Sequence, residues 1–208
     1  MSKVGIPAGI QGCLFSLANL AIQGAINAYG SVVVAGSSAA GSIDGFIYVS
    51  MNTFHQTAQT FLSQNIGAGK YDRVKDILKK CLLCTVVTGA ILCTVACVFS
   101  QPLLRIYNQD PAVVAAGTVR LYIAVAPYII FGLADVLTGA IRGCGSPVRP
   151  VVINLLCTCV FRLLWIAAIN TDTMPVTWVY ASYPASWLVL LIALTVCWLG
   201  PYRRKNRP

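Results

Sequence analysis

The sequence has no glutamate, one histidine and only six acidic residues among its 208 positions. Charged residues make up 10% of the chain and hydrophobic residues 57%, which is more apolar surface than the core of a soluble domain of this size needs. The first apolar stretch is also too long for the hydrophobic region of a cleavable signal peptide. The composition therefore excludes an ordinary soluble domain and predicts a membrane protein.

Motifs of intramembrane enzymes and metal sites are missing as well. The sequence has no Gly-x-Ser-x-Gly, no histidine pair at metal spacing and no aspartate dyad. Cys81 and Cys84 form a Cys-x-x-Cys pair, but no second pair stands at zinc-ligand spacing, and most other cysteines lie in apolar segments where they act as small hydrophobes. We expect no metal, no bound cofactor and no enzymatic activity.

Six apolar segments are long enough to cross a bilayer, which takes about 20 residues each. They predict an all-α, polytopic membrane protein with a six-helix transmembrane bundle over residues 1–200, followed by a basic tail over 201–208. The predicted spans are residues 4–29, 44–66, 81–100, 118–141, 148–169 and 178–199. An even number of crossings places both termini on the same side of the membrane.

The positive charge is concentrated on that side. Twelve of the 15 Lys and Arg residues lie in the termini and in the connections that share their face. Because Lys and Arg are retained in cytoplasmic loops, both termini are expected to be cytoplasmic in a multi-pass protein of the cell membrane. These cations flank apolar spans in short loops, so anionic lipid headgroups, and not nucleic acid, are the expected partner.

Local signals predict where several helices begin and end. Residues 30–41, rich in serine, alanine and glycine, predict a tight and weakly ordered outer connection. The glycines of residues 67–69 should end a helix, and the apolar spacing of residues 71–78 predicts a short amphipathic helix on the cytoplasmic headgroups. Asp110 followed by Pro111 is typical of a helix start.

Polar residues form stripes on the first two predicted spans. On the first span they are Gly12, Ser16, Asn19, Gln23 and Asn27, and on the second Asp44, Tyr48, Met51, Asn52, His55 and Gln59. Amides and hydroxyls in a membrane often serve only to hydrogen-bond neighbouring helices. So many of them on two spans favour instead a hydrated cavity, because intramembrane polar groups must face a partner or water.

Ionisable residues inside the spans are the sharpest functional candidates, since an aspartate in hydrocarbon is costly. Asp135 shares a helix face with Tyr128 and Phe131, which are further cavity-lining candidates. Asp135 and Asp44 are candidates for binding a coupling proton or small cation. Arg162 is predicted to pair with Asp44, and this pair would serve either coupling or simply helix register.

Four sequence strings resemble the C-terminal half of transporters of the multidrug and toxic compound extrusion (MATE) family. They are residues 5–11 (GIPAGIQ), 39–46 (AAGSIDGF), 64–73 (QNIGAGKYDR) and 139–145 (GAIRGCG). The resemblance extends from about residue 4 to residue 198. It implies a twelve-helix transporter made of two six-helix lobes, of which this chain supplies one.

The resemblance further implies a function. Members of the family are antiporters, driven by H⁺ or Na⁺, that export amphipathic and often cationic compounds across the plasma membrane without any cofactor other than the transported ion. Some members carry an acid in the helix equivalent to residues 4–29, but this sequence has none there. That departure directs attention to Asp135 and Asp44 as the coupling residues.

Two other functions remain open from the sequence. A flippase for lipid-linked precursors would be expected to have a wide basic cavity, and a non-transporting membrane scaffold would need only helix–helix contacts. A start so close to the first matching string suggests a fragment, a split gene or a second product of a transporter gene. Because alternating access needs two lobes, we expect the chain to require an N-terminal lobe or a second copy of itself.

Overall fold

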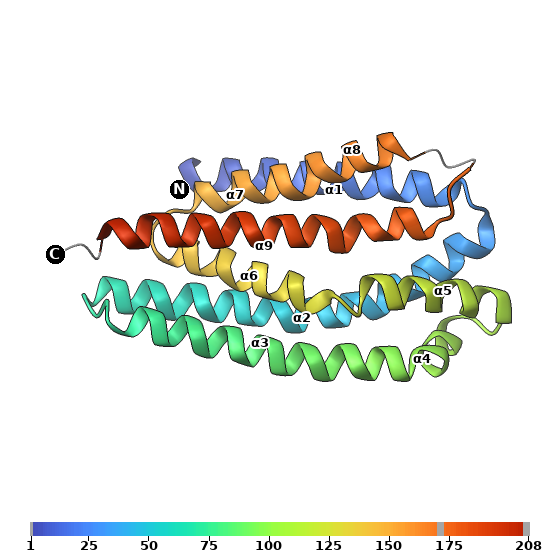
Figure 1. The fold of residues 1–208 in the computed structure, drawn as a ribbon, viewed down its shortest axis with the longest axis horizontal. Coiled ribbons are helices and arrows are strands. Elements are labelled where there is room, and N and C mark those ends of the chain that lie inside the picture. The colour runs from blue at the N-terminus through green and yellow to red at the C-terminus, as the bar shows by residue number, and fades with distance from the viewer. Residues whose placement is uncertain (1, 170–172, 206–208) are drawn as a thin grey trace.

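The computed structural model describes the backbone of residues 2–169 and 173–205 and the side chains of residues 15–169 and 173–200. Every regular element in these ranges is helical, so the predicted all-α class is confirmed. The helices run beside one another along one long axis (Figure 1). The start of the first helix and the end of the last lie at the same end of the bundle, as an even number of crossings requires.

Nine α-helices and one π-helical segment make up the described chain. They are α1 (Ser2–Asn27), α2 (Ser31–Gly67), α3 (Arg73–Val98), α4 (Ser100–Tyr107), α5 (Pro111–Ala124), α6 (Tyr128–Gly143), α7 (Val148–Asn154), the π-helix η1 (Leu155–Val160), α8 (Phe161–Ala168) and α9 (Thr177–Lys205). The segments α7, η1 and α8 follow one another without a break and form one long rod.

Several of the helices are long and apolar enough to cross a membrane. Within the described side chains they are α2, α3, the rod from Val148 to Ala168 and α9. The pair α5 and α6 makes a fifth span that is bent by 48°. The first predicted span coincides with α1, 26 residues long, but the side chains of residues 1–14 lie outside the described residues.

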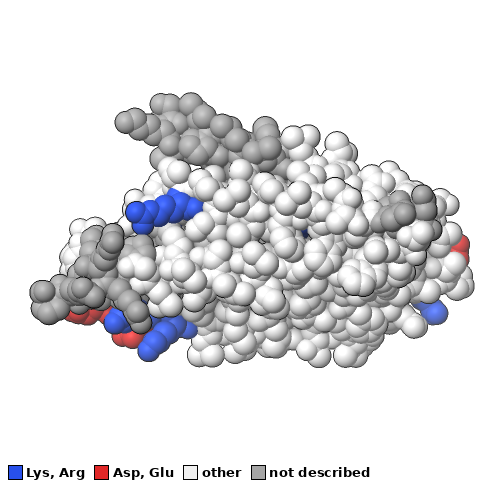
Figure 2. Space-filling view, turned by 45° about the horizontal axis from the view of Figure 1, so that its top comes forward, with Lys and Arg blue, Asp and Glu red and all other residues white. Residues whose placement is uncertain are grey.

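The surface agrees with a membrane-embedded middle. In Figure 2, blue and red side chains gather toward the two ends of the face, and the band between them is almost entirely white. Large apolar side chains are exposed along this length, among them Phe46, Leu83 and Val196, each at least 64% exposed. Lipid is the environment in which such exposure is stable.

The prediction of a weakly ordered connection over residues 30–41 was wrong, because α2 already begins at Ser31. The small residues of this segment allow close packing where a turn was expected. A Cβ atom on Gly36 would lie only 2.7 Å from the backbone nitrogen of Gly117 on α5. Here the glycine signal marks a helix crossing.

The separate surface helix predicted over residues 71–78 is also absent from the structure. Helix α3 begins at Arg73 and continues without interruption to Val98. Val74 and Leu78, 2% and 7% exposed, pack with Leu62 and Ile141 inside the bundle and do not face headgroups. The apolar face was recognised correctly, but it packs against other helices of the protein and not against lipid headgroups.

The predicted helix start at Asp110 is confirmed. The side chain of Asp110 accepts a hydrogen bond of 2.9 Å from the backbone N–H of Ala112, as an N-cap does, and Pro111 occupies the first turn of α5. The predicted end of the second helix is confirmed too, since α2 ends at Gly67 and Gly69 has φ of 71°.

The bend between α5 and α6 occurs at Pro127, which lacks the N–H that would continue the helical ladder. The backbone N–H of Val125 still bonds to Leu121, and that of Tyr128 bonds to Val125 across the break. Asp135 lies eight residues beyond Pro127, about 12 Å along the helix axis. The bend therefore changes the direction of the helix that carries Asp135.

Glycines of α6 bring its backbone close to α2. A Cβ atom on Gly143 would lie 2.7 Å from the Gln59 carbonyl oxygen, and one on Gly132 would lie 2.9 Å from the Met51 sulfur. A Cβ atom on Gly139 would overlap the carbonyl oxygen of His55. These contacts fix both the separation and the register of the two helices.

We predict that Gly139→Ala destabilises the bundle, because the added methyl group must push α2 away from α6. Overpacking of this kind costs about 1–3 kcal/mol. The measurement is the thermal unfolding midpoint of the purified chain, followed by circular dichroism at the helix band. Gly45→Ala on α2 is the matched control, since nothing lies within 4 Å of its added Cβ. Equal midpoints for the two variants would contradict the close-contact account.

Candidate functional site

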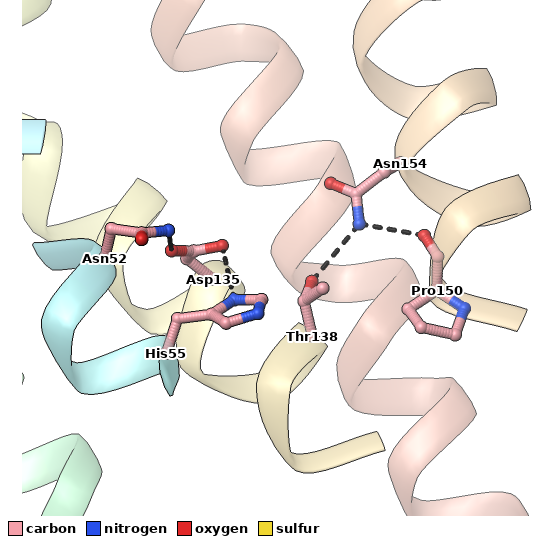
Figure 3. Close-up of polar contacts among 6 residues, drawn as sticks. All are labelled: Asn52, His55, Asp135, Thr138, Pro150 and Asn154. Carbon is pink, nitrogen blue, oxygen red and sulfur yellow. Dashed lines mark hydrogen bonds and ion pairs between the residues drawn. The ribbon is translucent and has the colours of Figure 1, made fainter. Parts of the chain in front are cut away.

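A carboxylate and an imidazole meet between α6 and α2. The Nδ1 atom of His55 lies 2.8 Å from Oδ1 of Asp135, and the side-chain amide of Asn52 donates to Oδ2 at 3.5 Å. Both residues of α2 point at the same carboxylate in Figure 3. The Asp135 side chain is 15% exposed and that of His55 6%, so water has little access to the pair.

The local sequence explains this geometry. Asn52 and His55 are three residues apart and therefore lie on one face of α2. Gly139, four residues after Asp135, lies on the same face of α6 and lets that face approach the backbone of His55. The sequence had placed Asn52 and His55 in a cavity-lining stripe and Asp135 among the coupling candidates, but nothing in it identified His55 as the partner of Asp135.

A cluster of aromatic rings, called the aromatic wall below, lies on the other side of Asp135. The ring centroid of Phe131 lies 6.0 Å from that of Tyr48, 5.2 Å from that of Tyr128 and 5.5 Å from that of Trp187. Tyr48 is 46% exposed, whereas Tyr128 and Trp187 are buried. Three of these residues were cavity candidates from the sequence. Trp187 was missed, because α9 carries no polar stripe that would have drawn attention to it.

Asp44 does not pair with Arg162 as predicted. Its Oδ2 lies 3.3 Å from a terminal nitrogen of Arg120 on α5, and Arg120 also donates to the carbonyl of Ser37. Gly41 makes the room for this guanidinium, whose nearest nitrogen would lie 3.2 Å from a Cβ at that position. The packing of α5 against α2 turns the Arg120 side chain inward, where it is 12% exposed.

Arg162 lies elsewhere, between α8 and α9, and is 3% exposed. Its Nε donates to the hydroxyl of Ser186 at 2.9 Å, and its guanidinium carbon lies 4.5 Å from the ring centroid of Tyr183. The described residues form two ion pairs, His55 with Asp135 and Asp44 with Arg120. Arg162 belongs to neither of them.

The polar stripe of α1 stays separate from the Asp135 pair. The side-chain amide of Gln23 donates to Asn27 at 3.2 Å, and Asn19 and Asn27 are exposed. No hydrogen bond within the described residues connects Asn19, Gln23 or Asn27 to α2 or α6. Gln59, the last residue of the stripe on α2, is partly exposed one turn beyond His55.

A second polar contact joins α6 to α7, close to Asp135 in the sequence. The Asn154 amide donates to the Thr138 hydroxyl at 3.2 Å and to the carbonyl of Pro150 at 2.8 Å (Figure 3). Thr138 is three residues beyond Asp135 on α6, and Asn154 ends α7. This contact attaches α7 to the helix that carries the carboxylate. In the sequence, the only sign of this contact is one asparagine in an apolar segment.

Known proteins resemble this chain in sequence and in fold. The probable multidrug resistance protein YoeA of Bacillus subtilis is 23% identical over 193 residues, and the FAD transporter of Shewanella oneidensis is 26% identical over 195 residues. These alignments cover 92% and 93% of the chain, but only 42% of each relative. The chain thus spans less than half the length of these relatives.

The fold matches one half of solved transporters. A crystal structure of MATE in complex with MaD3S superposes with a TM-score of 0.87 at 17% identity, covering 100% of this chain and 48% of that one. An outward-facing MATE family transporter gives 0.82 over the same shares. The six-helix lobe of a twelve-helix transporter is therefore the fold. The MatE family model matches residues 7–166, so the chain belongs to the MatE family of multi-pass membrane proteins.

Proposed function

We propose that the chain is the C-terminal lobe of a cation-coupled antiporter that exports amphipathic, often cationic, compounds across the cell membrane. An N-terminal six-helix lobe, or a second copy of this chain, completes the transporter, and both termini of the chain are cytoplasmic. Supporting the proposal are relatives named as multidrug resistance proteins and one named as an FAD transporter, all about twice as long as this chain.

The observation that carries the proposal is the pair of Asp135 and His55. Asp135 lies on the second helix of the pair bent by 48°, and it faces His55 on α2 beside the aromatic wall. An ion drives transport only if it binds the two conformations of the carrier with different affinity. A carboxylate shared between two helices meets this condition, because any shift of α6 along α2 changes the distance to His55.

The contacts of Asp135 favour a proton over a sodium ion. Nitrogen atoms of His55 and Asn52 already contact its two oxygens. A hard metal cation needs several oxygen ligands at once. A proton needs only one lone pair, and the carboxylate and the imidazole can share it. Proton binding would then neutralise the carboxylate and weaken its attraction for a cationic drug.

The aromatic wall supplies the surface for the drug. Tyr48 and Phe131 are the partly exposed rings of the cluster, and they are side by side at 6.0 Å. Aromatic faces attract organic cations and pack on their apolar parts. A compound seated on these rings would lie beside Asp135, so drug and proton would compete for one negative charge.

Asp44 is the weaker coupling candidate. One of its oxygens is committed to Arg120, and the other is buried without a partner within the described residues. We assign the pair of Asp44 and Arg120 to holding α2 against α5. Breaking a buried pair leaves an uncompensated charge, which is costly inside a membrane.

The first prediction of this proposal concerns the chain by itself. Expressed in cells that lack efflux pumps, it should leave their sensitivity to cationic drugs unchanged, because alternating access requires two lobes. A full-length relative such as YoeA expressed from the same promoter is the positive control, with drug resistance as the readout. Clear resistance from this chain alone would contradict the need for a separate N-terminal lobe and assign its place to a second copy.

The second prediction concerns the carboxylate. In the transporter completed by its partner lobe, Asp135→Asn should abolish drug efflux driven by an imposed pH gradient, measured in proteoliposomes, while membrane insertion stays normal. Asp76→Asn, an exposed acid near the start of α3, is the matched control and should retain efflux. Efflux that persists in the Asp135 variant under a pH or sodium gradient would rule out Asp135 as the coupling residue.

The third prediction concerns the imidazole. His55→Gln should reduce pH-driven efflux at least about ten-fold, because losing a hydrogen bond to a charged group costs about 1.5–3 kcal/mol. Gln56→Ala, the exposed neighbour on α2, should behave like the wild type. The measurement is the initial efflux rate at several imposed pH gradients. If a sodium gradient drives the unmodified transporter equally well, the proton assignment is wrong.

A further inference from the structure

Arg162 is a charged side chain in the membrane interior without a carboxylate beside it. It is 97% buried, and no aspartate of the described residues forms an ion pair with it. Its Nε is bonded to Ser186, whose own hydroxyl proton goes to the carbonyl of Tyr183 at 2.8 Å. The two terminal amino groups of Arg162 have no hydrogen-bond acceptor within the described residues.

A second buried group nearby also lacks a partner. The hydroxyl oxygen of Thr158 is buried and makes no hydrogen bond within the described residues, and Thr158 is 3% exposed. It precedes Arg162 by four residues, so both side chains lie on one face of the rod. A buried, unsatisfied polar atom in a native structure points to a missing ligand or water.

The backbone is irregular at the same place. The π-helical segment Leu155–Val160 contains Thr158 and ends two residues before Arg162. Such segments are rare and occur frequently at functional sites. Three independent features therefore coincide on one turn of the rod: an uncompensated guanidinium, an unpaired hydroxyl and a π-helical turn.

We propose that Arg162 and Thr158 bind an anionic group, a carboxylate or phosphate, of an aromatic compound. The guanidinium offers two donors in a fork that matches such an anion, and the Thr158 hydroxyl offers a third. Tyr183 and Trp187 lie 4.5 and 6.0 Å from the guanidinium carbon, and they supply rings against which an aromatic body packs. The proposed ligand is therefore a soluble organic anion with an aromatic ring.

Energetics favour an anion at this position. A cation in a low-dielectric interior is expensive unless it is paired. The Tyr183 ring and the Ser186 hydroxyl offset part of that cost, but neither carries a negative charge. A bound anion would neutralise the guanidinium, whereas a cationic drug would be repelled by it. The Arg162 site therefore selects a negatively charged compound, whereas Asp135 favours a positively charged one.

The inference rests on the proposed transport function and narrows its substrate class. With Asp135 on one side of the aromatic cluster and Arg162 on the other, connected through Phe131 and Trp187 at 5.5 Å, the lobe offers both charges to one ligand. Compounds that carry an aromatic ring together with an acidic group fit this arrangement.

The test measures binding to the purified chain in nanodiscs of neutral phosphatidylcholine. The probes are 2-naphthoate and 2-naphthylmethylammonium, which share a ring system and differ in charge, and binding is followed by equilibrium dialysis. The unmodified chain should bind the anion. Arg162→Gln should weaken binding of the anion about ten-fold or more and should not weaken binding of the cation, because it removes a positive charge.

Two milder variants keep the test meaningful if Arg162→Gln fails to fold. Arg162→Lys should bind the anion less tightly than the wild type, because an ammonium lacks the planar fork. Thr158→Val, which keeps the shape of the side chain and removes the hydroxyl, should weaken binding of the anion several-fold. Arg105→Gln on the exposed face of α4 is the matched control and should change nothing.

The outcomes separate this inference from the proposed function. If the cation binds but the anion does not, the proposed anion site is contradicted and cation export stands. The same holds if no Arg162 or Thr158 variant weakens binding of the anion. If neither probe binds, both fail. If phosphatidylglycerol added to the nanodiscs displaces naphthoate, the anion is a lipid phosphate, and the assignment to a soluble compound is overturned.

Discussion

The close approach of α6 to α2 is the constraint on which the candidate site depends. Because residues 132, 139 and 143 are glycines, no side chain at these three positions holds the two helices apart. Only at that separation can the short side chain of Asp135 reach Nδ1 of His55 at 2.8 Å. In a bilayer, where lipid tails are as apolar as leucine, such packing supplies much of the association energy that the hydrophobic effect supplies in water.

Lipid as the surrounding medium explains how the remaining ionisable groups are arranged. Asp44 meets Arg120 where α2 crosses α5, and the glycines at 36 and 41 provide the space. Arg162 instead lies against an aromatic ring and a hydroxyl. Asp44 and Arg120 thus neutralise each other within the lobe, whereas Arg162 has no carboxylate partner among the described residues. That asymmetry separates groups that hold helices together from a group that still requires a partner.

The sequence predicted the all-α class, the family and the polar face of α2, because apolar length, periodicity and turn residues are local properties. It failed where partners come from distant segments. The spacing of Val74 and Leu78 indicated an apolar face without revealing whether lipid or protein covers it. Likewise, an acid and a base in two spans suggested that Asp44 pairs with Arg162, while the register of α5 against α2 brings Arg120 to Asp44 instead.

The two departures from regular helix lie next to the two groups with proposed roles in binding. The bend at Pro127 precedes Asp135, and the π-helical turn precedes Arg162. Irregular backbone inside a membrane persists only where it is buried in protein or lines a cavity. A straight helix moves only as a whole, whereas a helix with a bend or a π-helical turn along its length can flex at that point. In the proposed transport cycle, the bend and the π-helical turn would let the helices flex beside the two groups whose partners must change.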